Sequence, residues 1–253
     1  MRLDDLLAWL CSIAPEESAF PDDPIGLLIR PAERNVARVA VCLDVTPAVA
    51  ETAAAENADL VICHHPLIYR PLNRIDTADP IGCAVATLVR EGISLYAMHT
   101  NWDGAEGGIN DTLARKLGLQ GIRPLSVAGP SQIARIGDLR GPITVQDFAA
   151  RIGETLDVSG ESALRYSPIH SERIIHHIAV CGGAGAGFLR EALAAGADAY
   201  VTADVRHHEF VDADSRGAIL FDAGHAGTER PGMAALASRI RQHFPDLSIS
   251  LLD

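Results

Sequence analysis

VARVAVCLDVT (36–46), PAVAETAAAENA (47–58) and DLVICHH (59–65) follow one another without a gap. The outer two segments are short apolar runs, a pattern typical of buried strands. The Ala-rich segment between them, with Pro47 in its first turn, predicts a helix. Because a strand, a helix and a second strand in succession build a parallel sheet, this stretch predicts an α/β fold.

The same alternation continues on both sides. IGCAVATLVREG (81–92) predicts a helix that stops at Gly92, ISLYAMH (93–99) a strand, and INDTLARKLGL (109–119) a helix. The first residues, MRLDDLLAWLCSIAPEE, carry acids within an apolar run, which favours an amphipathic helix over a signal peptide. No run approaches about 18 apolar residues, so we expect no membrane span and a cytoplasmic protein.

The pattern returns in the second half of the chain. Cys42 lies 17 residues before Asp59, and Cys181 lies 17 residues before Asp198, so two strand–helix–strand segments align without a gap. Each half then ends in a strand followed by His-x-x-x-acid, in LYAMHTNWD (95–103) and LFDAGHAGTE (220–229). Such self-similarity indicates duplication, although Ala-rich helices also resemble one another by chance.

We therefore predict two interlinked, duplicated α/β lobes with mixed, largely parallel sheets. The first lobe is expected to hold residues 1–125, with 226–253 returning to it, and the second lobe residues 126–225. The middle of the chain, about 122–172, has turns rich in Gly, Pro and Ser. It predicts a strand followed by a helix that starts near Thr144.

Charge and cysteine content narrow the functional class. The 253 residues carry 33 acids against 21 Lys and Arg, a net charge of -12 without a compensating basic run. This field repels a nucleic-acid backbone, so no nucleic-acid partner is expected. The five cysteines are odd in number, form no Cys-x-x-Cys pair and lie mostly in apolar runs. They predict small buried side chains in a reducing compartment rather than a disulfide framework.

His64 and His65 stand at the C-terminal end of a predicted strand, and Pro66 follows at once. Adjacent strand residues normally face opposite sides. At a strand end the backbone can turn, and both rings can then enter the crevice where ligands of open α/β sheets gather. The alternative is one surface histidine and one buried histidine.

Asp103 follows His99 by four residues, beyond the next predicted strand, in a loop rich in Gly and acids. The alternative to a metal ligand is a solvated turn in which Asn110 or Asp111 caps a helix. Glu106 is a spare carboxylate that we expect to be solvated.

His225 and Glu229 repeat the same spacing after the last long strand. On a helix the pair would share a face, but Pro231 and the neighbouring glycines favour a loop here. All these groups fall at predicted strand ends, and imidazole with carboxylate suits Zn, Mn, Fe or Ni. A carboxylate can bridge two cations, so we predict two divalent ions with open positions. The five donors are His64, His65, Asp103, His225 and Glu229.

A second histidine pair, His207 and His208, follows the strand ADAYVT. With Asp204, these residues could orient ligand imidazoles. Alternatively they open an exposed helix capped by Thr202 or Asp204.

GGAGAG (182–187) resembles a phosphate cradle but lacks the full G-x-G-x-x-G spacing, so we interpret it as a tight turn that could bind an anion.

No nucleophile triad emerges. The acid/base candidates are His99 and Glu106.

At these residues the sequence resembles a known family. ADLVICHHPLIYRPLNRI (58–75), MHTNWDGAEGGINDTLARKLGL (98–119) and DAGHAGTERPGM (222–233) are similar to segments of the Nif-three-like family of dinuclear-metal proteins, often labelled GTP cyclohydrolase 1 type 2 homologue. The resemblance spans nearly the whole chain. It implies two interlinked α/β lobes and a toroidal homohexamer built from trimers, with metal sites facing the interior.

The resemblance also implies a ligand set. Glu229 would bridge two ions, with His65 and Asp103 on one ion and His64 and His225 on the other.

His99 receives no direct bond from the resemblance, so it stays a candidate for orienting a ligand or handling a proton. The short 122–172 segment implies that this chain lacks the inserted domain of long members. The family's usual T-G-D appears here as Thr202-Ala203-Asp204, so a role for that glycine is not carried over.

The favoured function is a metal-dependent hydrolase of the GTP cyclohydrolase type 2-like family, in which two cations activate water and hold an oxyanion or phosphoryl oxygen. Arg70, Arg74 and Arg230 lie near the motifs and could receive a small anionic or nucleotide substrate. Two alternatives stay open: a non-catalytic metal-binding chaperone or regulatory adaptor, and a metal site that only stabilises the fold.

Overall fold

The computed structural model describes residues 1–31, 35–156, 158, 163–167 and 170–252. The chain divides into two compact units. Unit 1 holds Met1–Glu106 with Met233–Asp253, and unit 2 holds Gly107–Gly232. Each unit has its own sheet, and the predicted lobe boundaries near 125 and 225 stay predictions.

Unit 1 is built on a five-stranded sheet of order β1-β4-β3-β2-β11. Strands β11, β2, β3 and β4 run parallel, and β1 pairs with β4 antiparallel. The strands are β1 (Gly26–Ile29), β2 (Arg38–Cys42), β3 (Leu60–Cys63), β4 (Ser94–Ala97) and β11 (Ser248–Leu252). The helices are α1 (Leu3–Ile13), α2 (Pro47–Ala55), α3 (Pro80–Glu91), α4 (Thr100–Gly104) and the later part of α9 (His225–His243), with a 3-10 turn at Glu16–Ser18.

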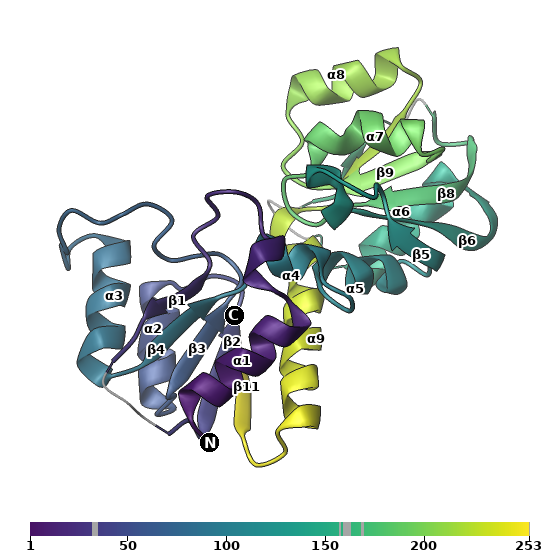
Figure 1. The fold of residues 1–253 in the computed structure, drawn as a ribbon. Coiled ribbons are helices and arrows are strands. Elements are labelled where there is room, and N and C mark those ends of the chain that lie inside the picture. Colours follow the sequence, from purple (N-terminus) through teal and green to yellow (C-terminus); the bar gives the residue numbers. More distant parts are fainter. Residues whose placement is uncertain (32–34, 157, 159–162, 168–169, 253) are drawn as a thin grey trace. The chain divides into compact units, whose positions relative to one another are not determined.

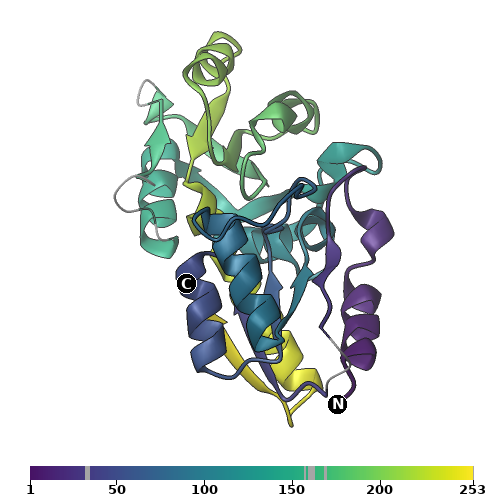
Figure 2. The same cartoon turned by 90° about the vertical axis from the view of Figure 1, so that its left-hand side faces the viewer.

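Helices cover both faces of this sheet. α2 and α3 lie on one face, and α1 with the later part of α9 lies on the other (Figures 1 and 2). Val61 and Leu95 of the sheet are fully buried with Leu88 of α3 in one apolar cluster. Because both faces are covered, the strands read as continuous apolar runs in the sequence. In the part of the chain that the structure describes, no helix is long and apolar enough to cross a membrane.

Unit 2 is built on a six-stranded sheet of order β5-β6-β8-β9-β10-β7. Strands β8, β9 and β10 run parallel, and the others are antiparallel to their neighbours. The strands are β5 (Gln120–Pro124), β6 (Arg135–Thr144), β7 (Arg165–Tyr166), β8 (Ile174–Val180), β9 (Ala199–Thr202) and β10 (Ile219–Asp222). The helices are α5 (Ile109–Lys116), α6 (Val145–Thr155), α7 (Leu189–Ala194), α8 (His207–Ser215) and the first part of α9, with 3-10 turns at Pro130–Ile133 and Ala186–Phe188.

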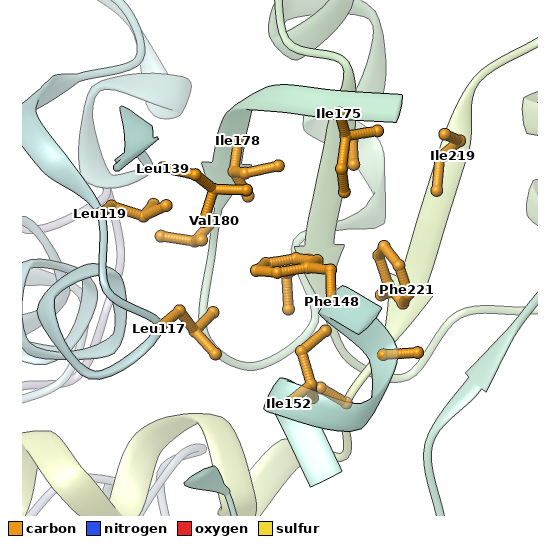
Figure 3. Close-up of a cluster of buried hydrophobic side chains, with 14 of the residues drawn as sticks. Leu117, Leu119, Leu139, Phe148, Ile152, Ile175, Ile178, Val180, Ile219 and Phe221 are labelled. Carbon is orange, nitrogen blue, oxygen red and sulfur yellow. The ribbon is translucent and has the colours of Figure 1, made fainter. Parts of the chain in front are cut away.

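The core of unit 2 lies between the sheet and helices α5 and α6. Figure 3 shows Phe148 and Ile152 of α6 facing the sheet side chains Ile178 and Phe221. The rings of Phe148 and Phe221 meet edge to face, with their centroids 5.5 Å apart. This packing holds the sheet of unit 2 in place, and with it the residues at the ends of its strands.

The two mixed sheets confirm the predicted α/β fold class, and the two units repeat one plan. Asp59 Oδ2 accepts hydrogen bonds from the amides of Ala37 and Arg38 at 2.8 and 2.9 Å. Asp198 Oδ2, 139 positions later, accepts two amide hydrogen bonds at 2.8 Å from the equivalent pair, residues 176 and 177. The strand register repeats at the same offset, because β2 pairs with β3 as β8 pairs with β9. A chance likeness of Ala-rich helices would not reproduce these bonds.

Local signals in the sequence mark where two helices begin or end, as predicted. Gly92 closes α3 in the left-handed region, with φ 66°. Thr144 caps α6 by accepting a hydrogen bond from the amide of Asp147, as the position near Thr144 suggested.

One local prediction is wrong. Pro231 and its neighbouring glycines favoured a loop, but α9 begins at His225 and continues through Pro231. A proline inside a helix removes one backbone hydrogen bond and costs about 3 kcal/mol. The later turns of α9 bury Met233, Leu236 and Ile240, and this packing outweighs the local preference.

A buried ion pair ties α5 to β6 within unit 2. Arg135, 4% exposed, donates from Nε to Asp111 Oδ1 at 2.5 Å, and the Gly107 amide donates to Asp111 Oδ2 at 2.9 Å. Burial raises the pKa of Asp111, but the Gly107 hydrogen bond and the Arg135 charge outweigh it, so the pKa is lowered overall. A lowered pKa means that Asp111 stabilises the fold above its unfolded pKa, and that this contribution is lost as the pH falls.

We expect Asp111→Asn to lower the free energy of unfolding at pH 7 by about 2–3 kcal/mol, since it removes hydrogen bonds to a charged group. Its stability should also fall less steeply than that of the wild type between about pH 5 and pH 3. Urea unfolding at a series of pH values measures both effects. Asp246→Asn, at an exposed carboxylate, is the control. Parallel curves for Asp111→Asn and the wild type would contradict the assignment.

Candidate metal centre

In unit 1 the parallel strands β2, β3 and β4 are neighbours, so their carboxyl ends meet at one edge of the sheet. Asp44 follows β2, His64 and His65 follow β3, and His99 follows β4. This is the edge at which open α/β sheets bind ligands.

Three imidazoles at this edge are fixed by the same kind of hydrogen bond. Each ring uses Nδ1 toward an oxygen that can only accept, so Nδ1 carries the proton and Nε2 presents its lone pair. The three bonds are His64 Nδ1 to the Met98 carbonyl, His65 Nδ1 to Asp44 Oδ1 and His99 Nδ1 to Asp23 Oδ1, each 2.8 Å long.

The three rings also gather. One ligand nitrogen from each of His64, His65 and His99 lies within 4.8 Å of the other two. Asp103, on the short helix α4, places Oδ1 3.5 Å from His64 Nε2. His64 is fully buried and Asp103 is 6% exposed. Unit 1 therefore brings its three predicted donors together and adds His99 to them.

The sequence alone did not reveal the two carboxylates that hold the rings. Asp44 stands just after a predicted strand, and the expected parallel neighbour would have placed it beside His65. Asp23 comes from the loop before β1, where no strand end points to the site. Burial raises its pKa, but hydrogen bonds from His99 and Thr100 outweigh burial, and the pKa of Asp23 is lowered overall.

Unit 2 presents the equivalent edge at the ends of β8, β9 and β10. Asp204 follows β9, and its Oδ2 accepts from His225 Nδ1 at 2.7 Å. His225 and Glu229 lie one turn apart on α9, with Nε2 3.2 Å from Glu229 Oε2. Hydrogen bonding to Glu229 raises the pKa of His225 to about 9, against the opposing effect of burial. Asp204 thus orients an imidazole, as the sequence suggested.

Glycine is required beside this pair. Gly183, just after β8, has φ 63°, and a Cβ built there would lie 2.3 Å from Glu229 Oε1 and 3.3 Å from His225 Nε2. The absence of a side chain at residue 183 lets Glu229 Oε1 and His225 Nε2 lie against its backbone. An imidazole nitrogen and a carboxylate side by side in this way fit a divalent cation.

The glycine-rich turn does not present an anion cradle. The amides of Gly182, Gly183 and Gly185 donate to side-chain oxygens within unit 2, so they are not aimed at a ligand. The acceptors are Asn110 Oδ1 at 2.6 Å, Thr228 Oγ1 at 3.0 Å and Thr202 Oγ1 at 2.9 Å.

The remaining candidates lie outside the two clusters. His207 and His208 are exposed at the start of α8. That helix is capped at Arg206, whose amide donates to Glu209 at 2.6 Å, so the predicted cap at Thr202 or Asp204 is wrong. Glu106 is exposed, as expected.

Two repeated α/β units, each with imidazole and carboxylate groups at the carboxyl ends of its parallel strands, define a duplicated α/β protein with candidate metal-binding side chains. Comparison with known sequences identifies the family to which this class of protein corresponds. The profile of Duf34/NIF3 (NGG1p interacting factor 3) matches residues 1–252, and the chain belongs to this family.

Individual relatives and solved structures agree with this family assignment. The "GTP cyclohydrolase 1 type 2 homolog" of Nostoc sp. is 36% identical, over 98% of this chain and 95% of the relative. "NIF3-like protein 1" of Drosophila melanogaster is 29% identical, over 90% of this chain and 78% of the relative. The structure of a Bacillus cereus protein related to NIF3 covers 100% of this chain and 97% of its own, with a TM-score of 0.92 and 22% identity. Reduced HcgD from Methanocaldococcus jannaschii covers 100% and 98%, with a TM-score of 0.85 and 25% identity.

We expect Gly183→Ala to weaken metal binding at His225 and Glu229, because its Cβ would lie 2.3 Å from Glu229 Oε1 and force that oxygen to move. Left-handed backbone also costs a residue with a side chain about 1–2 kcal/mol. Gly217→Ala is the matched control, since Gly217 has φ 66° and open space around its Cβ position. Both variants should lose similar stability in thermal unfolding, while only Gly183→Ala binds less Zn²⁺ than the wild type in equilibrium dialysis. Equal zinc binding by the two variants would count against the site.

Asp44→Asn and Asp204→Asn test the carboxylates that hold the rings. Removing such a partner usually weakens metal affinity about 10–100-fold without removing a ligand. Competition with a chromophoric chelator measures the affinity, and Asp5→Asn, at an exposed position, serves as the control. Affinities within a factor of about two of the wild type for both variants would contradict this role.

Proposed function

We propose that this chain is a dinuclear metal-binding protein that acts as a metal-dependent hydrolase. Its ligands would be His64, His65, Asp103, His225 and Glu229, with Glu229 bridging the ions. The observation that carries the proposal is the fixing of Nδ1 on every proposed imidazole ligand by an oxygen acceptor. Metal-ligating histidines almost always have this arrangement, which fixes the orientation of the ring.

When bound, two divalent cations polarise a substrate oxygen and activate water for attack. The residues of the chain supply orientation and proton transfer. Asp44 and Asp204 accept from Nδ1 of His65 and His225, so Nε2 of each ring is the nitrogen that would face a metal ion. His99 would handle the proton at Nε2, because Asp23 keeps its Nδ1 protonated.

The substrate we propose is a small anion, of the nucleotide or phosphoester kind. With a net charge of -12, the chain needs local cations to receive such a molecule. Arg70, Arg74 and Arg230 are exposed close to the ligand positions in sequence and could supply them. The name of the Nostoc relative, GTP cyclohydrolase 1 type 2 homolog, makes GTP the first compound to test.

A second function is a non-catalytic metal-binding adaptor. The family description, NGG1p interacting factor 3, favours it because it names an interaction rather than a reaction. The homohexamer expected from the resemblance would suit either function and stays a prediction.

Glu229→Gln separates these functions. It keeps the shape of the side chain, which is 3% exposed, but removes the charge that would bridge two cations. We expect the variant to bind less metal than the wild type and to lose hydrolysis of GTP or of p-nitrophenyl phosphate. A charged bridging group contributes several kcal/mol, so the loss of turnover should reach at least about 100-fold.

Glu154→Gln, at an exposed position of α6, is the control and should keep full metal content and turnover. Circular dichroism checks that both variants are folded. Turnover that survives in Glu229→Gln would exclude catalysis at this site. A wild type that binds metal but hydrolyses neither compound would favour the adaptor.

A further inference from the structure

A third group of metal-ligating side chains lies at the opposite end of the unit 2 sheet. His176 and His177 stand near the start of β8, whereas Gly183 follows its end. Asp138 lies on the neighbouring strand β6 and is the Cα partner of His177. This His/His/Asp cluster has no part in the centre proposed above.

The three side chains of the cluster lie close together. Asp138 Oδ1 lies 2.6 Å from His177 Nδ1. The rings of His176 and His177 are nearly perpendicular, with their centroids 4.8 Å apart. One ligand atom from each of the three residues lies within 4.8 Å of the other two. Donors of a tetrahedral zinc ion lie about 3.4 Å apart, so small side-chain rotations close the site.

The shared direction of two adjacent histidines needs an explanation, because neighbours on a regular strand face opposite sides. The pairing of β6 with β8 supplies it. The register shifts between Asp138 and Ile143, so a β-bulge or a similar irregularity lies beside this position. Bulges twist a strand locally and re-aim its side chains.

A simple cross-strand polar pair would need only Asp138 and His177, and would leave the position of the His176 ring unexplained. The fold does not require the cluster either. The equivalent residues in unit 1 are Ala37 and Arg38, which receive the same backbone clamp from an aspartate without any histidine. The two imidazoles are therefore an addition specific to unit 2.

We propose that Asp138, His176 and His177 bind one divalent cation of borderline softness, with Zn²⁺ as the first choice. Two imidazole nitrogens and one carboxylate oxygen make a three-ligand site whose remaining positions are open to water. The side chains of His177 and Asp138 are 52% and 43% exposed, so the ion would exchange readily with solution. This site is independent of the proposed hydrolase centre.

The test compares two histidine pairs of the same unit. In the background His65→Ala/His225→Ala, which disables the proposed centre, we expect about one Zn²⁺ per chain in equilibrium dialysis at roughly 0.1 mM free zinc. Adding His176→Gln/His177→Gln should abolish that zinc. Adding His207→Gln/His208→Gln, the exposed pair on α8, should leave it unchanged. Asp138→Asn should weaken the binding about tenfold.

Folding is checked by circular dichroism and by the thermal midpoint without metal. Should the background variant fail to fold, the same pairs are compared in the wild type, where the His176/His177 variant should bind about one Zn²⁺ fewer per chain. Equal zinc binding by the two double variants would overturn the proposal, as would an Asp138→Asn variant with wild-type affinity.

Discussion

The whole arrangement depends on the parallel pairing of three neighbouring strands in each unit. Parallel strands all end at the same edge, so the pairing of the backbone brings together the residues that follow β2, β3 and β4, or β8, β9 and β10. The aspartate clamps at Asp59 and Asp198 hold the other end of each strand pair in register. Residues far apart in sequence therefore meet because of backbone geometry, and the site chemistry follows from it.

Duplication kept the edge and changed its side chains. In unit 1 an aspartate after the first strand holds a histidine after the second, Asp44 with His65. In unit 2 the aspartate follows the second strand and the histidine the third, Asp204 with His225. The position of Asp44 is taken by Gly183, and Glu229 Oε1 lies where a Cβ would stand. One plan thus yields three gathered imidazoles in one unit and an imidazole–carboxylate pair in the other.

The sequence predicted the strands, the repeat and the histidines at strand ends, because these rest on local periodicity and spacing. It could not predict Asp23, which reaches His99 from a loop. It misjudged α9, since the packing of Leu236 and Ile240 overrides the local effect of Pro231. The glycine-rich turn was ambiguous because its hydrogen-bond partners are distant in sequence. The side chains that accept from its amides come from α5, β9 and α9.

The pairing of β11 with β2 has a consequence for how the protein is made. Ser248 pairs with Arg38, about two hundred residues apart, while unit 2 is one continuous segment, Gly107–Gly232. During synthesis unit 2 can complete its sheet first, and one edge of β2 stays uncovered until residues 248–252 leave the ribosome. Such an open edge invites pairing with other chains. Removal of residues 248–252 would keep both sets of site residues in the chain. Because the edge of β2 would then stay uncovered, both the nascent and the mature protein would be prone to aggregation.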